Sequence, residues 1–124
     1  MLLATGWLMD TQFTIERIDR VTAVTFLTQS LMNQSELERI GLALETLVDD
    51  GARAIVLDFS AVQFLSSLGI RMILLLQQKL KKAGGKGLCV CGISPQLAEL
   101  LRITRLDKVL KIARSREEAI RSAR

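Results

Sequence analysis

The feature that most constrains the fold is a run of four apolar residues, Ala54 to Leu57, followed directly by Asp58. A strand with one face in water alternates apolar and polar residues, whereas an uninterrupted apolar run is typical of a strand that is covered on both faces. Sheets of that kind are usually parallel and are flanked by helices. The run therefore predicts a layered sheet with helices packed on it.

The segments around this strand alternate between strand-like and helix-like patterns. In chain order we expect a β-hairpin over residues 13–28, a helix capped by Ser35 that ends before Gly51, the strand at 54–57, a helix from Ser66 to about Lys82, a strand at 87–91, a helix opened by Ser94 and Pro95, a short strand at 109–112 and a helix over 115–121. Strands that are separated by helices run mostly parallel. The predicted fold class is α/β, a mixed sheet with an N-terminal β-hairpin and then parallel strands, with helices packed on it.

The length and the apolar content fit one compact domain. The chain has 124 residues, of which 49% are hydrophobic, and no linker or repeat divides it. We predict an N-terminal tail at residues 1–10 and a single domain at residues 11–124. The tail is apolar but too short to span a bilayer and lacks the basic start of a secretory signal, so no transmembrane segment is expected. Trp7 would be exposed in such a tail unless it packed on a neighbour, and we therefore consider a homodimer through the tail.

Charge is divided between the two halves of the chain. Residues 1–70 carry four basic and nine acidic groups, a net charge of −5, and residues 71–124 carry thirteen basic and four acidic groups, a net charge of +9. This pattern predicts a dipolar molecule. No aromatic residue follows Phe64 in the sequence, so the basic second half offers no aromatic side chain on which the bases of a single strand could stack. Direct nucleic-acid binding is therefore not expected.

The composition argues against most enzyme classes. The chain has no histidine, which excludes histidine general bases, histidine metal ligands and Ser-His-Asp chemistry. Cys89 and Cys91 lie two apart on one strand, where both thiols point to the same side, so we expect buried thiols in a reducing cytoplasm and no metal. The segment 84–87 is glycine-rich but lacks the spacing of a phosphate-binding loop. We predict neither catalytic activity nor a cofactor.

The link from Asp58 to Ser67 is the candidate functional site. It leaves the carboxyl end of the apolar strand, which is where open α/β sheets place their sites, and it ends on two serines that open a helix. A helix start has free N–H groups and a partial positive charge, so it can accept a serine cap or a phosphate. Asp58 itself is predicted to make an Asx-type turn onto Ser60.

The sequence resembles a known family at two places. Residues 56–70, which read Val-Leu-Asp-Phe-Ser-Ala-Val-Gln-Phe-Leu-Ser-Ser-Leu-Gly-Ile, are similar to the strand, loop and phospho-switch helix of the STAS domain of bacterial anti-sigma factor antagonists. Residues 88–95 followed by 106–110 give a second match in the same order. The similarity covers nearly the whole predicted domain and implies the STAS fold.

The resemblance also implies a function and its residues. The phosphoacceptor of the family falls on Ser67. An anti-sigma factor with serine-kinase activity would bind the unmodified domain, release its sigma factor and then phosphorylate the serine, and a serine phosphatase would reset the switch. The predicted partner-binding residues are Leu65, Ser66, Leu68, Ile70, Met32 and Asn33.

Several alternatives stay open at this point. Ser66 could be the modified residue, or the serine pair could only cap the helix. The domain could instead be a constitutive regulatory subunit of a membrane transporter or signalling complex that needs no phosphate. A phospho-aspartate receiver is disfavoured because residues 28–33 offer no acidic pair for Mg²⁺.

Overall fold

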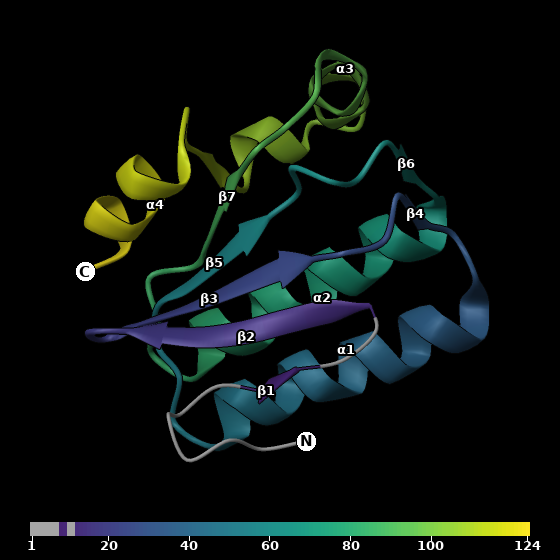
Figure 1. Ribbon diagram of the computed structural model, residues 1–124. Helices are drawn as coiled ribbons and strands as arrows, with labels where there is room; N and C mark the ends of the chain where they lie inside the picture. The colour runs from purple at the N-terminus through teal and green to yellow at the C-terminus, as the bar shows by residue number, and fades with distance from the viewer. Residues whose placement is uncertain (1–7, 10–11) are drawn as a thin grey trace.

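The computed structural model describes residues 8–9 and 12–124 and builds them around a six-stranded sheet (Figure 1). The elements are β1 (Leu8–Met9), β2 (Phe13–Ile18), β3 (Val21–Phe26), β4 (Ser30–Leu31), α1 (Gln34–Asp49), β5 (Ile55–Asp58), β6 (Phe64–Leu65), α2 (Ser67–Lys82), β7 (Leu88–Cys91), α3 (Pro95–Ile103), the 3-10 helix η1 (Leu106–Lys108), β8 (Lys111–Ile112) and α4 (Arg116–Ala123). The predicted α/β class and the predicted order of the long elements are confirmed.

The main sheet is mixed, as the sequence predicts. Its strand order is β1-β2-β3-β5-β7-β8, with antiparallel pairing from β1 to β3 and parallel pairing from β3 to β8. All four residues of β5 are buried, which agrees with its uninterrupted apolar sequence. The described part of the predicted tail, β1, extends the hairpin as an edge strand. Trp7 and the rest of the tail lie outside the described residues.

The two faces of the sheet are covered unequally. Figure 1 shows α1 and α2 side by side on one face and α4 on the other. The larger apolar core packs β2, β3, β5 and β7 against α1, α2 and α3. The smaller core places α4 over Val21, Val56, Cys89 and Cys91. Both thiols therefore lie on one side of β7 and are buried, as the strand period predicts.

The predicted cap of α1 was wrong. Ser35 lies in the first turn of the helix, and the cap is Asn33, whose Oδ1 accepts a hydrogen bond from the Glu36 backbone N–H at 3.0 Å. Asparagine caps helices as well as serine does, and β4 ends at Leu31, so the chain turns into the helix two residues earlier than the Ser35 pattern indicates. The expected caps Ser94 and Ser115 are confirmed by bonds to Leu97 and Glu118, both of 3.1 Å.

Candidate functional site

A second, two-stranded sheet builds the candidate site. β4 and β6 pair in parallel, with Ser30 opposite Phe64 and Leu31 opposite Leu65. Sequence patterns could not reveal this ladder because two residues are too few to show a period of two. The ladder joins the segment after β3 to the link that leads into α2. Met32 and Asn33 are thereby placed beside the start of α2.

One backbone carbonyl ties these segments together. The Leu31 carbonyl accepts a hydrogen bond from the Ser66 backbone N–H at 3.1 Å and another from the Ser66 hydroxyl at 3.3 Å. The Ser66 oxygen in turn accepts the Gly69 backbone N–H at 3.2 Å, which makes Ser66 the N-cap of α2. Ser66 is thus a structural cap that is half-buried.

Ser67 has a different environment although it is the next residue. It is the first residue of α2, and its side chain is exposed. No acidic side chain lies in the first turn of α2, and Arg71 is exposed one turn further along. The helix start therefore presents a solvent-accessible hydroxyl in a region whose free N–H groups favour negative charge.

Exposed apolar side chains lie on the segments next to this helix start. Met32 is 52% exposed, Phe64 is 51% exposed and Leu68 is 43% exposed. The predicted set of partner-binding residues included Met32 and Leu68 but missed Phe64. Phe64 was missed because its outward orientation depends on the pairing of β6 with β4, which leaves no pattern in the neighbouring sequence.

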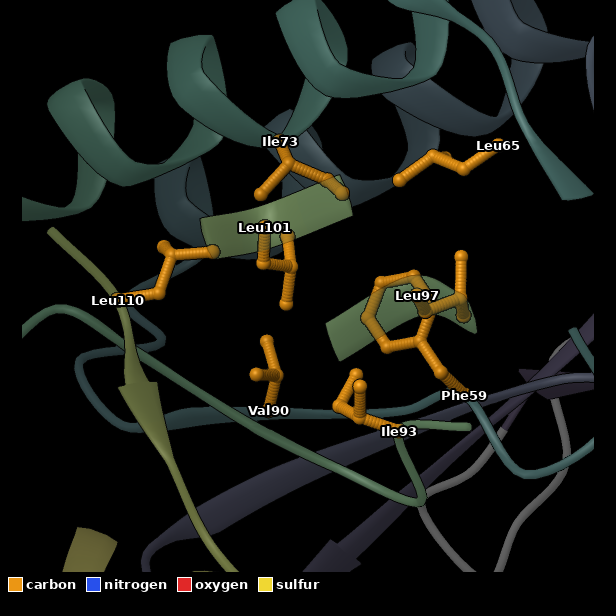
Figure 2. Close-up of a pocket in the computed structure, with 8 residues that line it drawn as sticks. All are labelled: Phe59, Leu65, Ile73, Val90, Ile93, Leu97, Leu101 and Leu110. Atoms are coloured by element: carbon orange, nitrogen blue, oxygen red, sulfur yellow. The ribbon is translucent and has the colours of Figure 1, made fainter. Parts of the chain in front are cut away.

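Leu65 and Ile70, which the sequence placed on the same contact surface, are half-buried and pack against the larger core. Figure 2 shows Leu65 pointing toward an apolar pocket between α2, α3 and β7. The free space in that pocket is about 10 Å³, roughly one water molecule, so the site is well packed. Its lining is Phe59, Leu65, Ile73, Val90, Ile93, Leu97, Leu101 and Leu110. The side chain of Leu65 anchors the start of α2 from below.

Asp58 holds the beginning of the link. Its Oδ1 accepts the Ser60 backbone N–H at 2.9 Å and the Ser60 hydroxyl at 2.5 Å, which confirms the predicted Asx-type turn. Its Oδ2 lies 3.4 Å from Nη1 of Arg116 in α4. Gly92 has a φ of +69°, and a Cβ there would collide with Asp58 and Ser60. Asp58 therefore acts as a structural anchor.

Neither a metal centre nor a membrane span is found in the part of the chain that the structure describes. Within residues 8–9 and 12–124, no group of three or more side chains that commonly bind metals could hold an ion. No helix in these segments is long and apolar enough to cross a bilayer.

Comparison with known proteins assigns the fold to a family. The sequence matches the STAS domain family model over residues 12–119. The chain belongs to the STAS domain family. This STAS domain is also 30% identical over 108 residues to BtrV of Bordetella bronchiseptica, which is named as a candidate anti-sigma factor antagonist. The match spans 87% of this chain and 90% of BtrV.

Solved structures share the architecture of this STAS domain. An anti-sigma factor antagonist from Mycobacterium paratuberculosis superposes with a TM-score of 0.78, 23% identity and coverage of 99% of this chain and 98% of that chain. The phosphorylated form of the Bacillus cell fate determinant SpoIIAA superposes with a TM-score of 0.71, 24% identity and coverage of 90% and 99%. At these identities the likeness establishes the fold.

Proposed function

We propose that this protein is an anti-sigma factor antagonist, a binding module that sequesters an anti-sigma factor and thereby frees a sigma factor. The observation that carries the proposal is the exposed Ser67 hydroxyl at the start of α2, bordered by the exposed side chains of Met32, Phe64 and Leu68. The name of the BtrV relative supports this function over the alternative of a transporter subunit. STAS domains of this family are binding modules, and we propose no catalytic role.

The switch that we propose is phosphorylation of Ser67. A hydroxyl can lie within an apolar contact, but a phosphate adds a charge of about −1.5 to −2. Burying that charge against an apolar partner without cationic groups costs several kcal/mol. In the free protein the phosphate would face the N-terminal amides of α2 and solvent, where it is tolerated. Phosphorylation thus weakens the complex without unfolding the domain.

The proposed partners follow from this switch. They are an anti-sigma factor with serine-kinase activity, which binds the surface around Ser67 and modifies it, and a serine phosphatase, which resets it. Met32, Phe64 and Leu68 would make the direct contacts, whereas Asn33, Ser66, Leu65 and Ile70 would hold that surface in place. We place the protein in the cytoplasm, where sigma factors act. A homodimer through the N-terminal tail also stays a prediction.

Binding measurements on two Ser67 variants test the switch. We expect Ser67→Asp to weaken binding to the organism's serine-kinase anti-sigma factor at least about tenfold, because the carboxylate mimics part of the phosphate charge. Ser67→Ala is expected to bind normally and to resist release in the presence of ATP. Isothermal titration calorimetry and phosphate labelling measure both properties. Normal binding by a folded Ser67→Asp protein would contradict the proposal.

Ser66→Ala is the matched control, because it removes the neighbouring hydroxyl. Loss of this N-cap is expected to lower the free energy of unfolding by about 1 kcal/mol, whereas Ser67→Ala changes it by less than about 0.5 kcal/mol. Phosphate labelling of Ser66→Ala is expected to persist. If labelling is lost in Ser66→Ala and kept in Ser67→Ala, Ser66 is the acceptor.

A further inference from the structure

One exposed cation of α2 has no partner in the fold. Arg71 lies four residues after Ser67 in the same helix, and both side chains are exposed. The Arg71 side chain forms no hydrogen bond or ion pair with the residues that the structure describes. We propose that Arg71 binds the phosphate on Ser67 within the same chain and so stabilises the phosphorylated, partner-free form. This inference rests on the proposed switch.

The spacing of the two residues fits such a contact. Residues four apart on a helix lie on one face, with Cβ atoms about 5 to 6 Å apart. Helical side chains lean toward the N-terminus of the helix, which is the direction in which Ser67 lies from Arg71. An acidic group that precedes a basic group at this spacing is also in the favourable order. The phosphate therefore comes within reach of the guanidinium without any change of the backbone.

The chemistry of the two groups is matched. A phosphate adds three acceptor oxygens and a charge of about −1.5 to −2. The guanidinium of an arginine is a planar fork of donors that can bind two phosphate oxygens at once, whereas a lysine offers a single point charge. The unmodified Ser67 hydroxyl carries no charge. The contact is therefore specific to the phosphorylated form.

The segments around the helix start supply no other cation. Pairing of β4 with β6 brings residues 28–38 and 59–70 together at this place, and neither segment contains a lysine or an arginine. Their charged side chains are Glu36 and Glu38, which are both acidic. Arg71 is the first basic residue of α2. It is therefore the cation best placed to neutralise a phosphate on Ser67.

The groove that Arg71 lines does not hold its side chain. This groove has a volume of about 530 Å³, runs between α1 and α2, and is also lined by Glu38 and Glu45. Both carboxylates have other partners. Glu38 accepts a hydrogen bond from Gln34 Nε2 at 3.2 Å, and Glu45 lies 3.9 Å from Lys79 Nζ. The guanidinium is therefore free to turn toward the phosphate.

The contact would place two charges at the proposed interface. In the free protein both groups face solvent, where an ion pair is weakly stabilising. An apolar partner that covered the site would have to remove water from the phosphate and from the guanidinium together. That penalty can exceed the attraction between the two charges. Arg71 therefore favours the partner-free state once Ser67 is phosphorylated.

A protein with phosphoserine encoded at position 67 tests the inference without any kinase. Urea denaturation compares the phosphorylated and unmodified forms of the natural chain and of Arg71→Gln. We expect Arg71→Gln to raise the equilibrium constant of unfolding about threefold more in the phosphorylated form than in the unmodified form at about 0.05 M salt. This excess should disappear near 1 M salt, where exposed charges are screened. Arg71→Lys should retain part of the stabilisation.

Lys82→Gln is the matched control, because it removes another exposed positive charge from α2. Lys82 is the last residue of the helix, about 22 Å along its axis from Ser67, so phosphorylation should not alter the effect of this substitution. In NMR spectra the Arg71 Nε–H resonance should shift on phosphorylation, whereas that of Arg121 in α4, on the other face of the sheet, should not.

An equal effect of Arg71→Gln in the two forms would overturn the inference, as would an Arg71 Nε–H resonance that does not respond to the phosphate. Neither measurement involves an anti-sigma factor. Failure of the kinase to label Ser67 would therefore count against the proposed function, whereas labelling of Ser67 without the effect of Arg71 would count against this inference alone.

Discussion

At the scale of single residues, Gly69 shows how closely the candidate site is packed. It lies in the first turn of α2, where alanine is ordinarily the better helix former. A Cβ at this position would collide with Cδ1 of Leu65 and lie 3.0 Å from the Leu31 carbonyl oxygen. The absence of a side chain lets β4 and β6 approach the helix. Gly69 therefore keeps Met32 and Ser67 on one surface.

Gly69→Ala is expected to destabilise the protein. Overpacking against Leu65 and the Leu31 carbonyl should cost about 1 to 3 kcal/mol, which exceeds the gain of roughly 1 kcal/mol in helix propensity. Urea denaturation measures the change. Gly41→Ala is the control, since its Cβ would reach only 3.4 Å from Cγ of Met72 and should leave stability unchanged or raise it. A Gly69→Ala protein as stable as Gly41→Ala would show that the site is loosely packed.

Residue patterns predicted part of this site. The cap at Ser66 and the turn at Asp58 were predicted because caps and turns depend on neighbours within three positions, whereas Ser67 as phosphoacceptor stays a prediction from the family resemblance. Phe64 and the contact between Leu31 and Gly69 were not found, because both depend on pairing between β4 and β6. Such pairing joins residues that are more than thirty positions apart and leaves no local pattern.

At the scale of elements, Arg116 attaches α4 to the sheet. Its Nη1 donates to Thr25 Oγ1 at 2.8 Å and lies 3.4 Å from Asp58 Oδ2, while its Nη2 lies 2.9 Å from Glu16 Oε1. One side chain thus contacts β2, β3 and β5. The turn at Asp58 was predicted correctly from its neighbours, but its partner Arg116 could not be, because it is 58 positions away.

Arg116→Gln is expected to weaken the docking of α4. Loss of the guanidinium leaves the nearly buried Asp58 carboxylate without its cation and should lower the free energy of unfolding by about 1 to 3 kcal/mol. Cys89 and Cys91, which α4 covers, should react faster with a thiol reagent. Arg121→Gln, at an exposed position on the same helix, should change neither property. Unchanged thiol reactivity in Arg116→Gln would show that α4 is held by its apolar contacts alone.

At the scale of the whole molecule, the two faces of the sheet differ in their protection. One face carries α1, α2 and α3, whereas the other is covered within the described residues by the short helix α4. Both cysteines lie on that thinner face, and burial raises the pKa of the Cys89 thiol and raises the pKa of the Cys91 thiol to about 12. The neighbouring Asp58 carboxylate also raises the pKa of Cys91.

Stability is therefore expected to fall at alkaline pH. The folded protein keeps Cys91 protonated, whereas the unfolded chain loses the proton near its ordinary pKa of about 8.5, so the contribution is complete below that pH and is lost as pH rises toward 12. The loss is at most about 1.4 kcal/mol per thiol and pH unit. Urea denaturation at about pH 8 and 10 should show the decline, without interference from tyrosine, which the chain lacks.

A variant with Cys89→Ala and Cys91→Ala is the control for this decline. It should be less stable at about pH 8, because two buried side chains are shortened, but its stability should change less between pH 8 and 10. An equally steep decline of stability in the variant would show that these two thiols do not cause it. The overall α/β architecture could be predicted without knowledge of long-range contacts, because strand and helix periods alone indicated the order of the long elements.

The single carbonyl of Leu31 has a consequence for engineering. Its two hydrogen bonds from Ser66 hold the end of β4 to the start of α2. The shape of the proposed interface therefore does not depend on which side chain stands at position 32. Met32 is half-exposed and does not cap the helix, a task that belongs to Asn33. Position 32 is therefore suited to the design of pairs of antagonist and partner that bind each other and not the partners of other pairs. Libraries at this position could alter which partner is recognised while the fold and the serine switch stay intact.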